Sequence, residues 1–387
     1  MSLMKIGLLT PWISHGGGGV AEAVIVLART LHAAGQVEPV VVCLSERDDL
    51  EQRGRLAGIR IISDGWFGPR SFGFSPNLLL SLLRAEVDIV HLHGIWMWTS
   101  VVGLGWAAST GRPYVISPHG MLEPWILKRS PIKKALARNL YEGPSLRRAN
   151  LLHALTDVEA ESIRAFSPSA HVRVVPNGME PVSASLDCAD ARSPEPYVLY
   201  LGRLHPKKNL EALLKAWQLA TIGSSVMRTR LIIAGTGDEH YVKSLKALVT
   251  TLAIDSGVEF VGPVFGDEKA RLLANAQWLA LPSLSEGLPM VVLEAWNHGV
   301  PTLMTDACNL PDGFGCGAAV RIGDTPQTIS VQLASALAEP ATILRTRSDA
   351  ARALVHRQFN ANVIAGHWVN IYSGLRTQQA TDAERRL

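Results

Sequence analysis

The stretch SEGLPMVVLE, Ser285–Glu294, places two glutamates, Glu286 and Glu294, at a predicted junction between a strand and a helix. The apolar run Trp278–Pro282 before it is typical of a buried parallel strand that ends at its proline. Pro289 lies near the first position of a helix, where proline has no N–H bond to lose. The sequence therefore predicts a strand, a loop that carries Glu286, and a helix that carries Glu294 about one turn from its start.

This edge of a sheet is where ligands are expected. In an open α/β sheet, ligands bind at the carboxyl ends of the strands. The start of the following helix offers backbone N–H groups and a positive dipole end to phosphates. The Glu286 carboxylate would lie beside such a phosphate site, and the Glu294 carboxylate would lie further along, in the helix. Together they suit the hydroxyls of a nucleotide-activated sugar. The alternative is a pair of solvated acids at a helix start, where acids are favoured in any case.

The size and composition of the chain indicate a soluble α/β protein of two or three domains. Its 387 residues are too many for a single hydrophobic core. An apolar content of 47% with 18% charged residues is ordinary for a well-packed globular protein. The net charge of +3 is small, so the charge balance predicts no nucleic-acid partner.

Cysteines and apolar segments indicate the compartment. The four cysteines form no CxxC pair and match no zinc-ligand spacing, which predicts a reducing, cytoplasmic location and no metal site. We interpret the apolar start, residues 1–9, as a first strand rather than a signal peptide. The longest apolar stretch, residues 95–108, is too short to span a membrane.

Apolar strands alternate with helical segments along both halves of the chain, which is typical of parallel sheets covered on both faces. Residues 181–196 lack a periodic pattern and are interpreted as a linker. The predicted fold is α/β, with one Rossmann-like domain at 1–180, a second at 197–358, and a cleft between their strand ends. The predicted strands are residues 5–9, 39–44, 88–93, 114–117, 151–155, 172–176, 197–201, 230–234, 258–261, 278–281, 302–304 and 319–322.

The first predicted strand is followed by four glycines: Gly16, Gly17, Gly18 and Gly19. Glycine lets the backbone approach an oxyanion closely, so this turn suits a phosphate. With Ala21 the run also satisfies the pattern G-x-G-x-x-A, and Glu46 follows the second strand, as in a dinucleotide-binding fingerprint. A plain tight turn is the alternative.

Cations lie at the start of the second domain. Arg203 follows Gly202 at a predicted strand end, and Lys208 comes just before the next helix. A guanidinium and an ammonium placed there would neutralise a diphosphate without a metal. The alternative is a solvated basic turn, which is how we interpret Lys207. A later turn again places glycines after a strand, namely Gly235 and Gly237.

Histidines lie at two strand ends of the first domain. His119 follows a strand in the sequence SPHG, residues 117–120, and is suited to contacting a ligand at that edge. The alternative is a structural histidine whose hydrogen bonds are satisfied within the domain. We interpret His91 and His93 as pointing to opposite faces of the preceding strand, which would exclude a metal pair there.

Basic residues dominate residues 112–148, where only Glu123 and Glu142 carry negative charge. Apolar residues are interleaved with the cations, as in segments that lie on anionic lipid headgroups. A solvated helix face that packs on its own domain is the alternative. The residues predicted to form this membrane or acceptor surface are Trp125, Lys128, Arg129, Lys133, Lys134 and Arg138.

Taken together, these motifs resemble those of the retaining glycosyltransferases of family 4, which have the GT-B fold. The resemblance covers nearly the whole chain. It is most specific in the second domain, where GR…K at 202–208, AGTG at 234–237 and P…EGLP…LEA at 282–295 occur in family order. The first domain adds the glycine run, SPHG and the PNG of residues 176–178. Glu180 stands where the family usually has aspartate.

The resemblance implies roles in donor binding. Arg203 and Lys208 would hold the donor diphosphate, and Glu294 would accept hydrogen bonds from the ribose hydroxyls. Residues 16–19 would approach the phosphates, and the glycines at 202, 235 and 237 would also line the donor site.

The resemblance also implies roles at the transferred sugar. Glu286, with the amides of Gly287 and Leu288, would hold hydroxyls of that sugar. His119 would reach the sugar near the reaction centre. The C-terminal helix, about residues 359–375, would cross back onto the first domain.

The implied reaction moves a hexose from a UDP- or GDP-linked donor to a saccharide or polyprenyl-linked acceptor. No DxD motif is visible, so we expect no obligatory metal and no cofactor. Charge stabilisation by Arg203, Lys208 and a helix N-terminus would supply the main catalytic term. No protein nucleophile is apparent, so we expect a front-face substitution with retention of configuration. The basic stretch suggests surface polysaccharide assembly, with the protein peripheral on the inner face of an anionic membrane.

Other classes of function stay open at this point. An NAD-dependent oxidoreductase would explain the first glycine turn but gives no role to Arg203, Lys208 or the two glutamates. A non-catalytic sugar-nucleotide-binding partner would keep the same motifs and differ in turnover alone. An epimerase or a phosphorylase could share the GT-B fold. Measuring donor hydrolysis with and without an acceptor would distinguish either of them from a glycosyltransferase.

Overall fold

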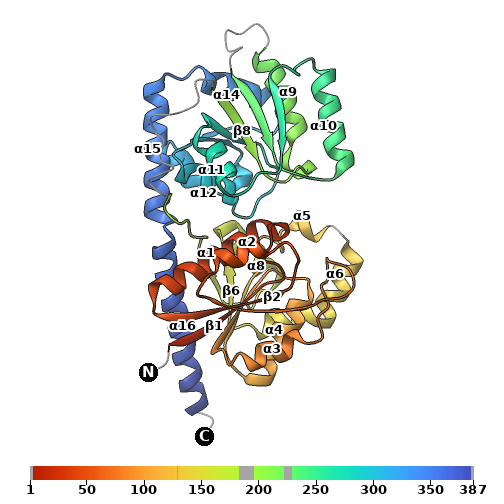
Figure 1. The fold of residues 1–387 in the computed structure, drawn as a ribbon, viewed down its shortest axis with the longest axis vertical. Coiled ribbons are helices and arrows are strands. Elements are labelled where there is room, and N and C mark those ends of the chain that lie inside the picture. The colour runs from red at the N-terminus through yellow and green to blue at the C-terminus, as the bar shows by residue number, and fades with distance from the viewer. Residues whose placement is uncertain (1–2, 129, 183–195, 222–228, 385–387) are drawn as a thin grey trace. The chain divides into compact units, whose positions relative to one another are not determined.

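The computed structural model describes residues 3–128, 130–182, 196–221 and 229–384, which form two compact units. Unit 1 comprises Met1–Glu180 and Asn360–Leu387, and unit 2 comprises Pro181–Phe359. Each unit is a parallel sheet with helices packed on it (Figure 1). The prediction of two Rossmann-like α/β domains is therefore confirmed. Of the predicted linker, residues 183–195 lie outside the described part of the chain.

The sheet of unit 1 has the order β3-β2-β1-β4-β5-β6-β7. Strands β1 to β3 extend the sheet toward one edge, and β4 to β7 extend it toward the other. The strand order therefore switches between β1 and β4, and doubly wound folds bind ligands at such a switch point. The strands are β1 (Met4–Leu9), β2 (Val37–Leu44), β3 (Arg60–Asp64), β4 (Ile89–His93), β5 (Tyr114–Ser117), β6 (Leu151–Ala154) and β7 (Val172–Val174). The helices are η1 (His15–Gly17), α1 (Gly18–Ala34), α2 (Leu50–Arg55), α3 (Leu78–Arg84), α4 (Trp98–Thr110), α5 (Pro124–Leu127), α6 (Pro131–Ala137), the π-helix η2 (Arg138–Glu142), α7 (Gly143–Arg148), α8 (Asp157–Phe166) and α16 (Ala361–Glu384).

Alternate residues of the central strands fill two separate cores in unit 1. Val41 and Cys43 of β2 pack in the core that includes α1 and α16, whereas Val40 and Val42 pack in the core that includes α3 and α4. This alternation follows from the two-residue period of a strand. Burial raises the pKa of the Cys43 thiol to about 12, as expected of a packed cysteine.

The last helix, α16, belongs to unit 1. Trp368 and Tyr372 on this helix are buried in the same core as α1, and Figure 1 shows α16 beside α1. Met179 pairs with Asn360 where the chain leaves and re-enters the unit. A Cβ on Gly178 would lie 2.7 Å from the Cα of Ala361, so this crossing requires a residue without a side chain.

The sheet of unit 2 has the order β10-β9-β8-β11-β12-β13. Its strands are β8 (Tyr197–Leu201), β9 (Arg230–Ala234), β10 (Val258–Gly262), β11 (Trp278–Leu281), β12 (Thr302–Met304) and β13 (Ala319–Arg321). Its helices are η4 (Pro206–Lys208), α9 (Leu210–Thr221), α10 (Glu239–Thr251), α11 (Gly266–Ala274), α12 (Met290–Asn297), η5 (Asp306–Cys308), α13 (Pro311–Cys316), α14 (Pro326–Leu337) and α15 (Ala341–Gln358). Within the described ranges of the whole chain, no helix combines the length and the hydropathy needed to cross a bilayer.

Candidate donor site and the histidine turn

Lys208 and Glu286 form an ion pair at the carboxyl edge of the unit 2 sheet. Lys208 ends η4, after β8, and Glu286 lies in the loop between β11 and α12. The Lys208 ammonium donates to Oε1 of Glu286, and the two side chains are only 13% and 7% exposed. Ser283 Oγ donates to the same oxygen at 2.6 Å. Separate roles were predicted for these two residues from the sequence, and their pairing was not predicted.

The loop that carries Glu286 is held by hydrogen bonds to its backbone groups. Asn309 Nδ2 donates to the carbonyl oxygens of Glu286, at 2.5 Å, and Gly287, at 3.1 Å. Asn309 has a φ of 58°, in the left-handed region that asparagine tolerates better than most residues. The backbone N–H of Glu286 donates to the carbonyl of Ala307 at 3.0 Å. Asn309 was missed in the sequence, where the only available signal was an asparagine at the end of a short turn.

The start of α12 lies immediately after this loop. Pro289 is the N-cap residue of α12, and no described side chain caps this helix by a hydrogen bond. Gly287 and Leu288 precede the proline. The first amides of a helix and the positive end of its dipole favour an anion at this position.

The glycines after β8 and β9 are explained by close packing of two turns. A Cβ on Gly235 would lie 1.9 Å from the carbonyl oxygen of Gly202, and one on Gly237 would lie 2.0 Å from that of Leu204. Gly235 also has a φ of 139°. The side chain of Arg203, which lies between these packed residues in the sequence, is exposed.

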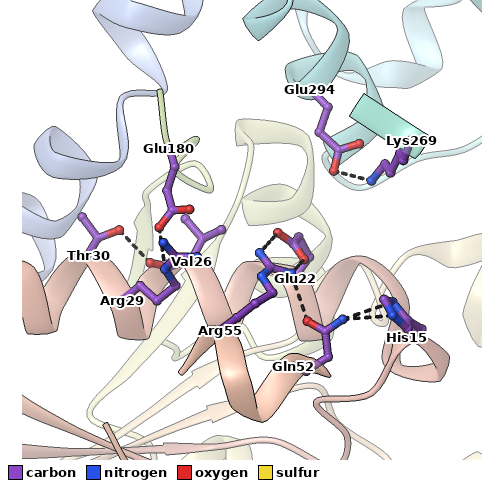
Figure 2. Close-up of polar contacts among 10 residues, drawn as sticks. All are labelled: His15, Glu22, Val26, Arg29, Thr30, Gln52, Arg55, Glu180, Lys269 and Glu294. Carbon is purple, nitrogen blue, oxygen red and sulfur yellow. Dashed lines mark hydrogen bonds and ion pairs between the residues drawn. The ribbon is translucent and has the colours of Figure 1, made fainter. Parts of the chain in front are cut away.

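Glu294, predicted to bind ribose, is paired with a lysine in the structure. Lys269 on α11 contacts Glu294 on α12, with 2.7 Å between Nζ and Oε1 (Figure 2). The Glu294 side chain is 14% exposed and that of Lys269 is 31% exposed. Nothing in the sequence indicated this partner, because the two residues are 25 positions apart and lie on different helices.

In unit 1, the glycine turn is flanked by side chains from α2 and from the loops after β2 and β3. His15 contacts Gln52 at 3.2 Å and Glu51 at 3.0 Å; Figure 2 shows the contact with Gln52. Arg70 binds both carboxylate oxygens of Glu46, at 2.9 and 3.2 Å, and Ser14 Oγ donates to Glu46 as well. Glu46, which a dinucleotide-binding fingerprint would assign to a ribose, is therefore engaged by the protein itself.

His119 lies in a strained turn at the end of β5. Its φ is 54°, and its Nε2 lies 3.0 Å from Nδ1 of His93. Burial, and secondarily the nearby His153, lower the pKa of His119 to about 3, so the ring is neutral at physiological pH.

The prediction that His91 and His93 point to opposite faces of β4 is wrong. Their ring centroids are 4.1 Å apart. Residues two apart on a strand share a face, so the spacing itself places both rings on one side of the sheet. His91 contacts Tyr372 of α16 at 2.7 Å and Ser117 at 2.6 Å. Among the residues that the structure describes, no group of three or more histidine, cysteine, aspartate or glutamate side chains is arranged to hold a metal ion.

An apolar stripe flanked by cations lies on α6 and η2. Ile132, Leu136 and Leu140 recur every four residues and are 84%, 61% and 67% exposed. Lys128, Lys133 and Arg138 are exposed and Trp125 is partly buried, whereas Lys134 donates to the carbonyl of Ile126 and lies 6.0 Å from the Trp96 ring centre. Arg129 lies outside the described residues. We call Lys128, Ile132, Lys133, Leu136, Arg138 and Leu140 the basic–apolar surface.

The chain is similar to known proteins both in fold and in sequence. The structure of Anabaena HepE in complex with UDP and glucose covers 96% of this chain and all of its own, with a TM-score of 0.76 and 19% identity. The sequence matches the model for group 1 glycosyl transferases over residues 195–339 and that for glycosyltransferase family 4 over residues 17–182. This chain belongs to the GT-B glycosyltransferases.

Curated relatives of this GT-B glycosyltransferase differ in how much of their length is matched. A phosphatidyl-myo-inositol mannosyltransferase of Mycobacterium leprae is 26% identical over 97% of this chain and 98% of its own. A D-inositol 3-phosphate glycosyltransferase of Nocardioides sp. is 30% identical, but the match spans 57% of this chain and 54% of that protein. An O-antigen chain mannosyltransferase B of Escherichia coli is 32% identical over 36% of each.

Proposed function

We propose that this GT-B glycosyltransferase is a retaining hexosyltransferase. It moves a hexose from a UDP- or GDP-linked donor to a saccharide or lipid-linked acceptor without an obligatory metal, in the assembly of a surface polysaccharide. The observation that carries the proposal is the Lys208–Glu286 pair beside the start of α12. The names of the relatives, which include two mannosyltransferases, support a hexose as the transferred sugar.

The paired lysine can still bind a diphosphate. An ammonium group has three hydrogens to donate, and the contact with Glu286 uses one of them. The other two can be donated to phosphate oxygens, beside the exposed guanidinium of Arg203 and the first amides of α12. These groups stabilise the negative charge that develops on the leaving nucleoside diphosphate, which is the main barrier-lowering effect available here.

The carboxylates serve the neutral parts of the donor. Glu286 is held in place by Lys208 and Ser283, which leaves its second oxygen to accept from a hydroxyl of the transferred sugar. Glu294 accepts from the ribose hydroxyls, and Lys269 keeps its carboxylate oriented. His119 contacts the sugar as a neutral ring. In a front-face substitution, the bond between the anomeric carbon and the phosphate oxygen breaks, the acceptor oxygen bonds to that carbon on the same face, and the leaving phosphate takes the acceptor proton. The product therefore keeps the anomeric configuration, which proton NMR of the product reads directly.

The donor is identified by a thermal-shift screen of UDP-, GDP- and ADP-sugars with NAD as the rival ligand. A ligand at a hundred times its dissociation constant stabilises a protein by about 2.7 kcal/mol. Stabilisation by NAD alone would overturn the proposal in favour of an oxidoreductase. Stabilisation by a sugar nucleotide without transfer or hydrolysis would indicate a non-catalytic binding partner.

Glu294→Ala should weaken binding of the donor and of the free nucleoside diphosphate. The ribose loses a charged acceptor, and hydrogen bonds to charged groups contribute roughly 1.5–3 kcal/mol, or about tenfold or more in affinity. Calorimetric titration measures the change. Lys269→Ala is the comparison, because it keeps the carboxylate and removes only its partner, so it should weaken affinity less. Equal affinities of wild type and Glu294→Ala would rule out the ribose assignment.

We also propose that the basic–apolar surface binds an anionic membrane near the acceptor. The cations flank a stripe of exposed apolar side chains, the arrangement that lets lysine and arginine reach headgroups while leucine and isoleucine enter the interface. Each such cation contributes about 1 kcal/mol near an anionic surface, and salt screens the attraction. The occupant proposed here is the headgroup layer of an anionic bilayer.

Flotation with liposomes tests this membrane contact. The wild type should float with anionic liposomes at low salt, and neither with neutral liposomes nor at high salt. Changing Lys128 and Lys133 to serine should weaken the partition about thirtyfold, from about 2 kcal/mol lost. Changing Lys243 and Lys246 of α10 to serine removes the same charge from unit 2 and should leave flotation intact. A wild type that ignores anionic liposomes at low salt would show that the surface is a solvated face.

A further inference from the structure

Glu159 is a buried carboxylate for which the proposed reaction has so far given no role. It lies in the first turn of α8, after β6, and is 1% exposed. Among the described residues it has no ion-pair partner. Its Oε1 accepts from the backbone N–H of Gly120 at 2.6 Å, and its Oε2 accepts from that of Leu155 at 2.8 Å. One carboxylate thus joins the loops that follow two adjacent strands, β5 and β6.

The first of these loops is the histidine turn. Gly120 directly follows His119, and both have a positive φ, 76° and 54°. A residue with a side chain is disfavoured in this region, and such conformations persist where the surroundings fix them. The bond from Gly120 to Glu159 fixes the turn from the backbone side. The contact with His93 fixes the imidazole of His119 from the other side, at 3.0 Å.

Helix capping accounts for only part of the role of the carboxylate, because the bond from Leu155 is local to the start of α8 whereas Gly120 is 39 residues away in the sequence. Thr156 is the N-cap residue of α8, and its Oγ1 accepts from the N–H of Glu159 at 3.2 Å. Burial raises the pKa of Glu159, against the hydrogen bonds from Gly120 and Leu155 that favour the charged form. A buried charge of this kind carries a desolvation penalty, and its bond to the distant Gly120 amide is not part of the cap of α8.

We infer that Glu159 is a positioning residue for His119: it holds the turn at Gly120 so that the imidazole meets the transferred sugar in one fixed orientation. The inference rests on the proposed contact between His119 and the sugar. Glutamine cannot replace the carboxylate, because its NH2 group would face one of the two backbone N–H donors. Glu159→Gln therefore leaves Gly120 or Leu155 without an acceptor, with little change in side-chain volume.

The test compares kcat with nucleotide affinity. Glu159→Gln should lower kcat by about tenfold to a hundredfold, the effect expected of a displaced catalytic contact. The dissociation constant of the nucleoside diphosphate should stay within about twofold of the wild type, because its proposed ligands are in unit 2. In a His119→Ala background, Glu159→Gln should lower kcat no further, since the two residues act as one unit. An equal loss of kcat in both backgrounds would overturn the inference.

A second readout does not depend on turnover. Hydrogen exchange at the Gly120 amide should accelerate at least tenfold in Glu159→Ala, which removes both acceptor oxygens, and the NMR resonances of the His119 ring should shift. Thr156→Ala is the matched control: it removes the cap of the same helix but keeps the carboxylate, so Gly120 exchange and kcat should stay at wild-type values while the unfolding temperature falls. Fast exchange at Gly120 in Thr156→Ala would assign the effect to helix stability and overturn the inference. A wild type without turnover on any sugar nucleotide would instead refute the proposed function, and the exchange data would still decide the role of Glu159.

Discussion

Lys208→Met is expected to lower kcat about a hundredfold, because removing one preorganised group that stabilises developing charge has an effect of this size. The Lys208 side chain is only 13% exposed, so its charge acts on a bound phosphate with little screening by water. Arg203→Ala should cause a loss of similar order, since its exposed guanidinium is the second cation of the same turn. Lys207→Ala removes a neighbouring cation and should leave kcat near the wild-type value.

The Lys208 variant needs a control for stability, because it leaves the buried Glu286 without its cation. Breaking a buried pair destabilises by about 3–5 kcal/mol. Adding Glu286→Gln removes the unpaired charge, so the double variant should regain most of the unfolding temperature. Its affinity for the nucleoside diphosphate should stay as low as in Lys208→Met, since Glu286 is proposed to contact the sugar rather than the phosphates. If affinity recovers together with stability, Lys208 has a structural role only.

Metal dependence is tested on the same enzyme. If Arg203 and Lys208 supply the positive charge, EDTA should leave turnover close to that of the untreated enzyme. An enzyme that is inactive in EDTA and recovers with Mg²⁺ or Mn²⁺ would contradict the metal-free proposal, whatever the result for the two cations.

The strands that position the site could be predicted from the sequence because they are buried on both faces. Runs such as Trp278–Leu281 are apolar throughout, and a continuous apolar run between helices is a strong local signal. Strand β3, Arg60–Asp64, was not predicted because it is an edge strand of mixed character, with one residue exposed and four partly buried. Helices α2 and α3, with six and seven residues, are too short for a periodic pattern to emerge.

The partners within the site could not be predicted for a different reason. Lys208 and Glu286 are 78 residues apart, and Gly120 and Glu159 are 39 apart. The sequence places Lys208, Glu286 and Gly120 near the ends of predicted elements and gave no role to Glu159, and the pairing depends on which strands are neighbours in the sheet. The error over His91 and His93 was avoidable, because the two-residue period of a strand decides it without any tertiary information.

Gly235→Ala is expected to destabilise unit 2 by about 3 kcal/mol, a large effect for one methyl group. The new Cβ would lie 1.9 Å from the carbonyl oxygen of Gly202, and the residue would keep a φ of 139°. Backbone strain of this kind amounts to about 1–3 kcal/mol, and overpacking adds about 1–3 kcal/mol. For a domain of 150–250 residues the sum corresponds to a fall of roughly 6–12 °C in the unfolding temperature, read by calorimetry.

Two other glycines of unit 2 distinguish the effect of backbone strain from that of the steric collision. Gly237→Ala introduces the collision alone, 2.0 Å from the oxygen of Leu204, whereas Gly262 has a φ of 81° with open space around an added Cβ. Gly262→Ala should therefore cause the smallest fall in unfolding temperature, Gly237→Ala a larger one, and Gly235→Ala the largest. This order follows if the glycines exist to let the turns after β8 and β9 pack together. A Gly235→Ala variant that unfolds at the wild-type temperature but has lost nucleotide affinity would show instead that the glycine is there for the ligand.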